Sequence, residues 1–172
     1  MTDKTPLFPL SNAFEPSIDD LFSSLADSAN SLNSLSDECN QLIENVENYL
    51  SSLNIGLDFW YKEKPVFRSD LTGSADPNSI SSYIEKRLGF CRINGSWVLG
   101  IKTVRCESGF FQGDLDMHFE NEYFDGEPIY LKGASRDLRI NSAAILSDFL
   151  LSYNEFVQNK VKEIQTTKNL MP

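Results

Sequence analysis

The stretch LGFCRINGSWVLGIKTVR, residues 88–105, contains the strongest local signal in the chain. Two runs of residues that favour β-strands flank Asn94-Gly95, the dipeptide best suited to a type I′ turn, in which both central residues need a positive φ. A two-residue loop sets the register, so Arg92 should face Trp97 across the two strands. Alternation of side chains then places one apolar set on a single face: Leu88, Phe90, Trp97, Leu99 and Ile101. We therefore predict a β-hairpin with that face in the protein core.

Residues 17–54 have the pattern of a long amphipathic helix. Ser17 and Asp20 form a capping box at its start, and Asn54-Ile55-Gly56 is a stop signal. Apolar residues recur at a spacing of three and four, with Ser28 the one clearly polar member of the series: Ile18, Leu21, Leu25, Ser28, Leu32, Leu35, Cys39, Leu42, Val46, Tyr49 and Leu53. This series, called the apolar seam below, is the heptad pattern of helices that pack on helices.

Three interpretations of this helix remain open from the sequence. It can lie on a sheet as an ordinary amphipathic helix, or pair with another helix through the seam. One helix of this length would span about 54 Å at 1.5 Å per residue, longer than a domain of this size covers. Because Ser28–Ser36 is rich in Ser and Asn, a helical hairpin broken near residues 30–33 is the third interpretation.

After the helix, residues 57–131 predict an antiparallel meander of four to six strands. Strands are expected at 57–62, 66–68, 114–122 and 129–131 in addition to the hairpin, with loops at 69–78 and 107–113. Residues 79–87 are ambiguous between strand and a short helical turn, since Ile80, Tyr83, Ile84 and Arg87 have helical spacing.

A second amphipathic helix is predicted over residues 135–166, starting at Ser135 or restarting at Ser142. Its expected core stripe consists of Leu146, Phe149, Leu150, Tyr153, Val157, Val161 and Ile164. The predicted fold is therefore α+β: a long N-terminal amphipathic helix, an antiparallel β-meander and a long C-terminal amphipathic helix. We expect a single domain over residues 17–166, a flexible N-terminal arm at 1–16 and a tail at 167–172.

Composition favours a soluble, cytoplasmic protein without a disulfide framework. No run approaches the roughly 18 apolar residues of a membrane helix, and the N-terminus lacks the features of a signal peptide. The cysteines are three in number, Cys39, Cys91 and Cys106, and form no CxxC pair. We expect them to be small buried or half-buried side chains.

The net charge of −10 is unevenly distributed. Residues 17–56 hold no Lys or Arg but seven acids, which are Asp19, Asp20, Asp27, Asp37, Glu38, Glu44 and Glu47. Such a chain repels the nucleic-acid backbone, so general DNA or RNA binding is not expected.

An acidic strand face is one candidate site. Asp114, Asp116, His118, Glu120 and Glu122 alternate along a predicted strand and share a face. The first four are hard oxygen ligands and an imidazole that could bind a divalent metal ion as part of an enzyme. Same-face neighbours lie nearly 7 Å apart, so a solvated strand face explains the pattern more economically.

A basic cluster is the other candidate site. Arg136 and Arg139 lie at a predicted helix start, where free N–H groups favour an anion. With Arg92 or Arg105 and the ring of Trp97, they could bind a small phosphorylated, nucleotide-like ligand. The plainer interpretation is that Arg92 packs on Trp97 and that the helix arginines pair with nearby acids.

No common catalytic motif is present: the chain lacks G-x-S-x-G, a Walker A loop, G-x-G-x-x-G and H-E-x-x-H. We predict no cofactor. The function we expect first is a non-enzymatic interaction or assembly module that uses its heptad-patterned helices. The partner we expect first is a second copy of the chain, in a homo-oligomer, and the alternative partner is another protein. The expected interface residues are Leu21, Leu25, Leu32, Leu35, Leu42 and Val46. Sequestration of a phosphorylated ligand and metal-dependent catalysis are the alternatives.

Overall fold

The computed structural model describes residues 17–72, 80–111 and 117–170. Its elements follow one another as α1 (Ile18–Ser52), β1 (Phe59–Trp60), β2 (Phe67–Thr72), β3 (Ser81–Ile93), β4 (Ser96–Phe111), β5 (Met117–Phe124), β6 (Ile129–Tyr130), a 3₁₀ turn (Leu131–Gly133), α2 (Arg136–Ala144) and α3 (Leu146–Leu170). The α+β class is confirmed, with a long helix before and after an antiparallel sheet. The chain divides into two compact units, residues 1–35 and residues 36–172.

The β3–β4 hairpin is the centre of the sheet in the second unit. Asn94 and Gly95 adopt φ values of 50° and 86°, as the type I′ turn requires. The pairs run in the predicted register from Ile93 opposite Ser96 through Arg92 opposite Trp97 and onward to Ser81 opposite Ser108. The hairpin prediction is therefore confirmed, and its strands are longer than the stretch that predicted it.

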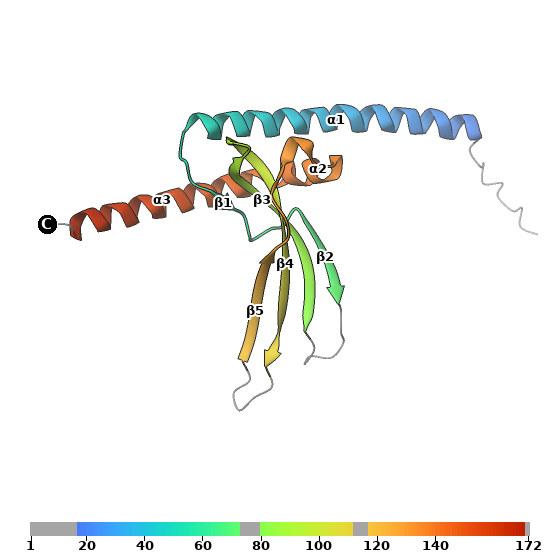
Figure 1. The fold of residues 1–172 in the computed structure, drawn as a ribbon. Helices are drawn as coiled ribbons and strands as arrows, with labels where there is room; N and C mark the ends of the chain where they lie inside the picture. Colours follow the sequence, from blue (N-terminus) through green and yellow to red (C-terminus); the bar gives the residue numbers. More distant parts are fainter. Residues whose placement is uncertain (1–16, 73–79, 112–116, 171–172) are drawn as a thin grey trace, which may run out of the picture. The chain divides into compact units, whose positions relative to one another are not determined.

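The outer strands pair along both edges of this hairpin, all of them antiparallel. Strands β1 and β2 pair with successive parts of β3, while β6 and β5 pair with successive parts of β4. Figure 1 shows that β2, β3, β4 and β5 extend beyond α2 and α3, so these two helices lie against one end of the sheet.

The core lies where the hairpin meets the helices. Four of the five hairpin residues predicted for the core face are essentially inaccessible and Trp97 is half-buried. They pack with side chains from residues 36–52 of α1 and from the helices after the sheet: Ile43, Leu50, Leu131, Leu138, Ile145, Leu146, Phe149 and Tyr153. Phe59 of β1 joins this core, with its ring 5.2 Å from the ring of Tyr153.

Helix α1 is one continuous helix, so the interpretation as a broken helical hairpin is wrong. The capping box is confirmed, because the Asp20 carboxylate accepts from the Ser17 N–H at 3.2 Å and Ser17 Oγ accepts from the Asp20 N–H at 3.2 Å. The helix ends at Ser52, and Asn54 and Gly56 follow with positive φ.

Several strand boundaries differ from the prediction. Ser69–Thr72 belongs to β2 and Glu107–Phe111 to β4, where loops were predicted, and the ambiguous residues 81–87 are part of β3. Backbone pairing holds these polar or Gly-containing segments in the sheet: residues 69–72 pair with β3, residues 82–86 pair with β2 and β4, and residues 107–111 pair with β5. Strand β1 is only two residues long, shorter than the predicted 57–62.

The C-terminal helical region is two helices rather than one. The Ser135 side chain caps α2 by accepting a hydrogen bond from the Leu138 N–H. Helix α2 ends before Ile145, and α3 begins at Leu146 and continues to Leu170. Leu146, Phe149 and Tyr153 are buried as predicted, but Val161 and Ile164 are 48% and 58% exposed and do not belong to the core. The predicted stripe therefore continues beyond the sheet that it packs on.

Candidate interaction surface

The apolar seam is largely exposed. Among its large members, Leu21, Leu25, Leu32, Leu35 and Leu42 are between 46% and 66% exposed, and Val46 is half-buried. The buried residues of α1 are four others: Ser36, Ile43, Glu47 and Leu50. The helix therefore packs on the sheet with one face and presents the seam on another.

The heptad explains how one helix has two such faces. With Ile18 at position a, the seam occupies positions a and d, and Ser36, Ile43 and Leu50 all fall at position e. Positions a and e lie about 40° apart around a helix and d lies on the far side of a, so burying e leaves d in solvent. This separation is seen at Leu42 and Tyr49, both at d, which are 46% and 62% exposed.

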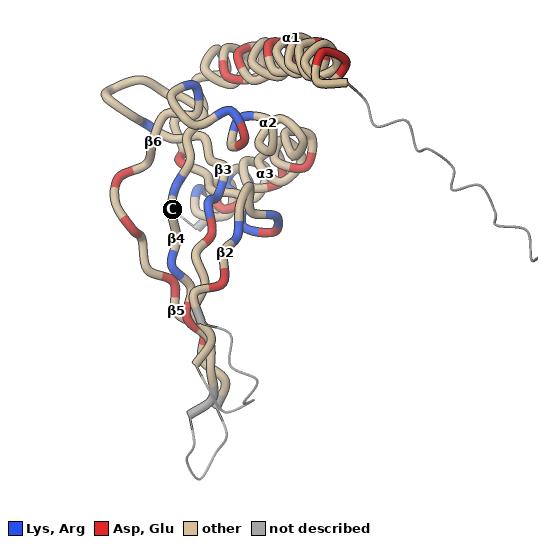
Figure 2. The backbone as a smooth tube through the Cα atoms, turned by 90° about the vertical axis from the view of Figure 1, so that its right-hand side faces the viewer, with Lys and Arg blue, Asp and Glu red and all other residues tan. Residues whose placement is uncertain are grey.

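Residues 18–35 belong to the other compact unit, and every one of them is exposed. Their large apolar side chains are Ile18, Leu21, Phe22, Leu25, Leu32 and Leu35, and each is at least 47% exposed. Figure 2 shows that the charges along α1 are all acidic. The segment is therefore an apolar helix face with acidic charges around it.

Glu47 holds residues 36–52 of α1 on the sheet. This carboxylate is 5% exposed, accepts from the Leu99 N–H at 2.9 Å and from the Tyr130 hydroxyl at 2.8 Å, and lies 3.6 Å from Lys132 Nζ. Burial and the hydrogen bond to Glu47 raise the pKa of Tyr130. The sequence showed Glu47 only as one acid in an acidic run, because its partners come from β4 and β6.

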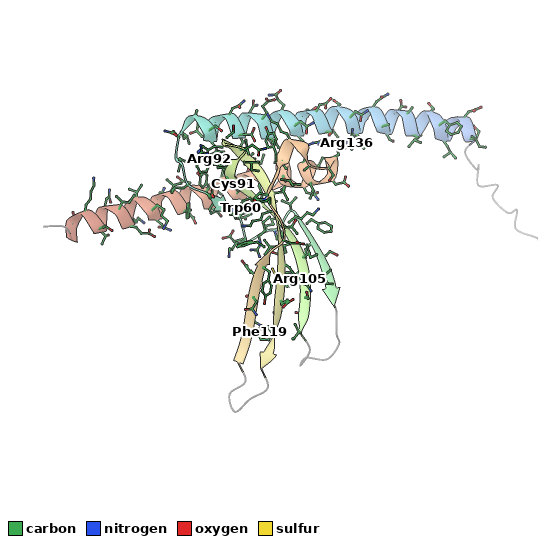
Figure 3. All side chains as sticks on the ribbon, viewed as in Figure 1. Trp60, Cys91, Arg92, Arg105, Phe119 and Arg136 are labelled. Carbon is green, nitrogen blue, oxygen red and sulfur yellow. The ribbon has the colours of Figure 1, made fainter. Side chains whose placement is uncertain are left out.

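The arginines predicted to bind a ligand do not converge. Arg92 is exposed at the hairpin end, where its Nε donates to the Gly95 carbonyl at 3.2 Å, and Arg105 pairs with Glu107 at 3.3 Å. Figure 3 places Arg92, Arg105 and Arg136 in three separate regions. Trp97 stacks on Phe90, with ring centroids 5.7 Å apart. Ligand binding by these residues stays a prediction that their positions do not favour.

Arg139 lies apart from the others, in a cleft of about 300 Å³ lined by Asn40, Ile43, Glu44, Lys132 and Arg139. Its guanidinium donates to Asn40 Oδ1 at 2.9 Å and to the Ala134 carbonyl at 2.6 Å. Lys132 pairs with Glu44 at 3.1 Å, so the cleft holds cations and a carboxylate side by side. This mixed charge gives no clear preference for an anion.

The acidic strand face is only partly described. His118, Glu120 and Glu122 lie on β5, while Asp114 and Asp116 fall outside the described residues. Glu122 pairs with Arg87 at 2.9 Å and with Lys62 at 3.0 Å. Within residues 17–72, 80–111 and 117–170, no group of three potential ligands is placed to hold a metal ion.

A buried ion pair on the sheet was missed from the sequence. Glu85 and Arg87 of β3 are both 5% exposed, and their charged atoms lie 2.7 Å apart. Arg87 also contacts Glu122. Burial alone would raise the pKa of Glu122, but the hydrogen bonds from Lys62 and Arg87 have a larger effect, so the pKa of Glu122 is lowered overall. Burial raises the pKa of neighbouring Tyr83 to about 12. In a strand, Glu85 and Arg87 lie on the same face because they are two positions apart. This spacing could have predicted the ion pair only if residues 79–87 had first been identified as a strand.

The cysteines are free thiols, with Cys91 and Cys106 buried and Cys39 half-buried, as expected. Burial raises the pKa of Cys91 to about 11, which keeps it protonated at neutral pH. Cys39 lies at position a of the seam, so it is the one cysteine on the candidate interaction surface.

No protein-family model matches the chain, and no similar curated protein or solved structure was found. Among the described residues, no helix combines the length and apolarity that crossing a membrane requires. The fold and its exposed surfaces are therefore the basis for inferring function.

Proposed function

We propose that this chain is a non-enzymatic self-association module that forms a homo-oligomer through the apolar seam of α1. The observation that carries the proposal is the position of the seam: α1 already packs on its sheet with another face, and the seam is left exposed. A single exposed leucine is ordinary on a protein surface. A stripe of large apolar side chains along a whole helix is typical of an interface.

The charges beside the seam favour a second copy as the partner. In paired helices, positions e and g flank the seam and decide which partners repel. In α1 the only charged residue at these positions is Glu38, whereas the other acids fall at b, c and f: Asp19, Asp20, Asp27, Asp37, Glu44 and Glu47. Two identical helices can therefore meet along the seam without bringing their acids together.

The test is to place charge on the seam. Leu25→Lys with Leu32→Lys puts two ammonium groups at the centre of the expected interface, where burying them is costly. We expect this variant to sediment as a monomer over a dilution series in which the unmodified protein sediments as an oligomer.

The matched control adds the same charge elsewhere on the same turns. Ser23→Lys with Asn30→Lys occupies position f, and all four substituted residues are exposed in the monomer. The control should keep the assembly, and circular dichroism should show equal helix content in both variants. Monomeric unmodified protein, or equal loss of assembly in both variants, would refute the proposal.

A further inference from the structure

We infer that two copies pair antiparallel along α1, with Phe22 of each copy beside a groove of the other copy. This inference rests on the proposed self-association and assigns its orientation, its register and the surface that receives the Phe22 ring. The groove has a volume of about 380 Å³ and is lined by residues of α1, of the chain just after it and of α3: Tyr49, Leu50, Leu53, Ile55, Leu150, Tyr153, Asn154 and Val157.

The groove is suited to an apolar helix face. None of its lining residues is charged, and Tyr49 and Leu53 are members of the apolar seam. Tyr49 is 62% exposed and Leu53 is 46% exposed in the isolated chain. The groove is thus continuous with the proposed interface and extends it from α1 onto α3.

Residues 18–35 present a face that is broader than a two-helix seam needs. Besides positions a and d, this segment has Phe22 and Ala29 at position e, and Phe22 is 65% exposed. Apolar residues at a, d and e are typical of a helix that packs on a folded body rather than on one helix. In residues 36–52 the e positions Ser36, Ile43 and Leu50 are buried in the isolated chain, but within residues 18–35 the e positions are exposed.

The position of Phe22 selects the antiparallel orientation. In a parallel pair, position e of one helix lies beside position g of the other, and the g residues near Phe22 are Ser17 and Ser24. In an antiparallel pair, e lies beside e, which brings Phe22 to the side of Leu50 in the second copy. Leu50 lines the groove, so only the antiparallel pair gives Phe22 an apolar site.

The seam also selects one antiparallel register. Pairing each a position with a d position sets Leu21 opposite Val46 and Leu25 opposite Leu42 of the second copy. In the same register Ser28 lies opposite Cys39 of the second copy. The polar member of the seam therefore faces a small thiol side chain rather than a leucine or valine. Twofold symmetry repeats each of these contacts, as a closed dimer requires.

Disulfide formation in a glutathione redox buffer, read on a non-reducing gel, tests the register. Cys91 and Cys106 are buried, so new interchain disulfides should come from the seam. We expect Ser28→Cys to cross-link to Cys39 of the second copy. The unmodified protein, and Ser28→Cys combined with Cys39→Ser, should not cross-link. A parallel dimer would instead cross-link both of these proteins through identical positions and overturn the inference.

A second measurement tests the groove itself. Phe22→Ser should weaken dimerisation about tenfold, because it removes an aromatic ring that the dimer would bury. The control Leu151→Ser changes a side chain of α3 that is 66% exposed, against 65% for Phe22, and does not line the groove. Equal affinities of the two variants would overturn the groove assignment. A dimer with no cross-link in any of the three proteins would reject the register but leave self-association standing, whereas a monomer would reject self-association as well.

Discussion

At the scale of single residues, Glu47 is the most informative position in the structure. The other acids of α1 face solvent, but the Glu47 carboxylate is buried. It accepts hydrogen bonds from the Leu99 N–H and the Tyr130 hydroxyl and forms an ion pair with Lys132. Its first two partners are separated from it by 52 and 83 positions in the chain. No local pattern connects residues so far apart, so the sequence could not distinguish Glu47 from the exposed acids.

Replacing Glu47 should destabilise the fold strongly. Glu47→Ala leaves the Leu99 N–H and the Tyr130 hydroxyl without an acceptor, at a cost of about 3 kcal/mol in the free energy of unfolding. Urea denaturation at one fixed protein concentration measures this difference. Glu44→Ala is the control, since Glu44 also contacts Lys132 but its side chain is 48% exposed, and it should cost less than about 1 kcal/mol. Similar losses in the two variants would contradict the role assigned to Glu47.

At the scale of elements, the two halves of α1 have different structural roles. Residues 36–52 pack on the sheet through Ile43, Glu47 and Leu50, whereas residues 18–35 belong to a separate compact unit and are exposed throughout. The heptad pattern runs through both halves without a change of phase. The continuous helix agrees with the unbroken phase of the pattern in the sequence, but the sequence did not show that position e, and not the seam, covers the core.

Two truncations should separate the role of residues 36–52 in folding from the proposed role of residues 18–35 in assembly. A chain that begins at Ser36 keeps the contacts of Ile43, Glu47 and Leu50, so it should melt within a few degrees of the seam variant Leu25→Lys with Leu32→Lys and should be monomeric. A chain that begins at Leu53 loses those contacts and should lose cooperative unfolding, because the apolar face of the hairpin is uncovered. Thermal denaturation and sedimentation velocity measure both properties. An oligomeric chain starting at Ser36 would contradict the assignment of assembly to residues 18–35.

The strands show the same dependence on context at the scale of elements. Residues 81–87 and 107–111 have weak or ambiguous local patterns, yet both belong to the longest strands of the sheet. Residues 82–86 pair with both β2 and β4, and residues 107–108 pair with both β3 and β5, while residues 109–111 pair with β5. This pairing overrides the intrinsic preferences of Ser, Gly and Glu.

At the scale of the whole molecule, net charge opposes the proposed assembly. Each chain carries a net charge of −10, so two copies repel one another at long range. The seam and the groove contain no charged residue, and their apolar contacts do not weaken when salt screens charge. Association should therefore be governed by apolar burial opposed by a screened repulsion.

Salt should then strengthen the dimer. The Debye length is about 10 Å at 0.1 M salt and about 3 Å at 1 M, so added sodium chloride removes most of the repulsion. We expect the dissociation constant, measured by sedimentation equilibrium, to fall by several-fold between these conditions. A dissociation constant that rises with salt would instead indicate an interface built on ion pairs, contrary to the seam.

The sequence by itself determined the α+β order of elements, the β3–β4 turn and its register, and the apolar seam. These features depend on neighbours in the chain: Asn94-Gly95 requires positive φ, and the heptad places side chains on one helix face. Tertiary structure alone decided which face of α1 is buried, where the arginines lie and why Glu47, Glu85 and Arg87 tolerate burial. Those outcomes depend on atoms brought together from distant positions, and no local spacing encodes the hydrogen bonds and ion pairs that offset the cost of burying a charge.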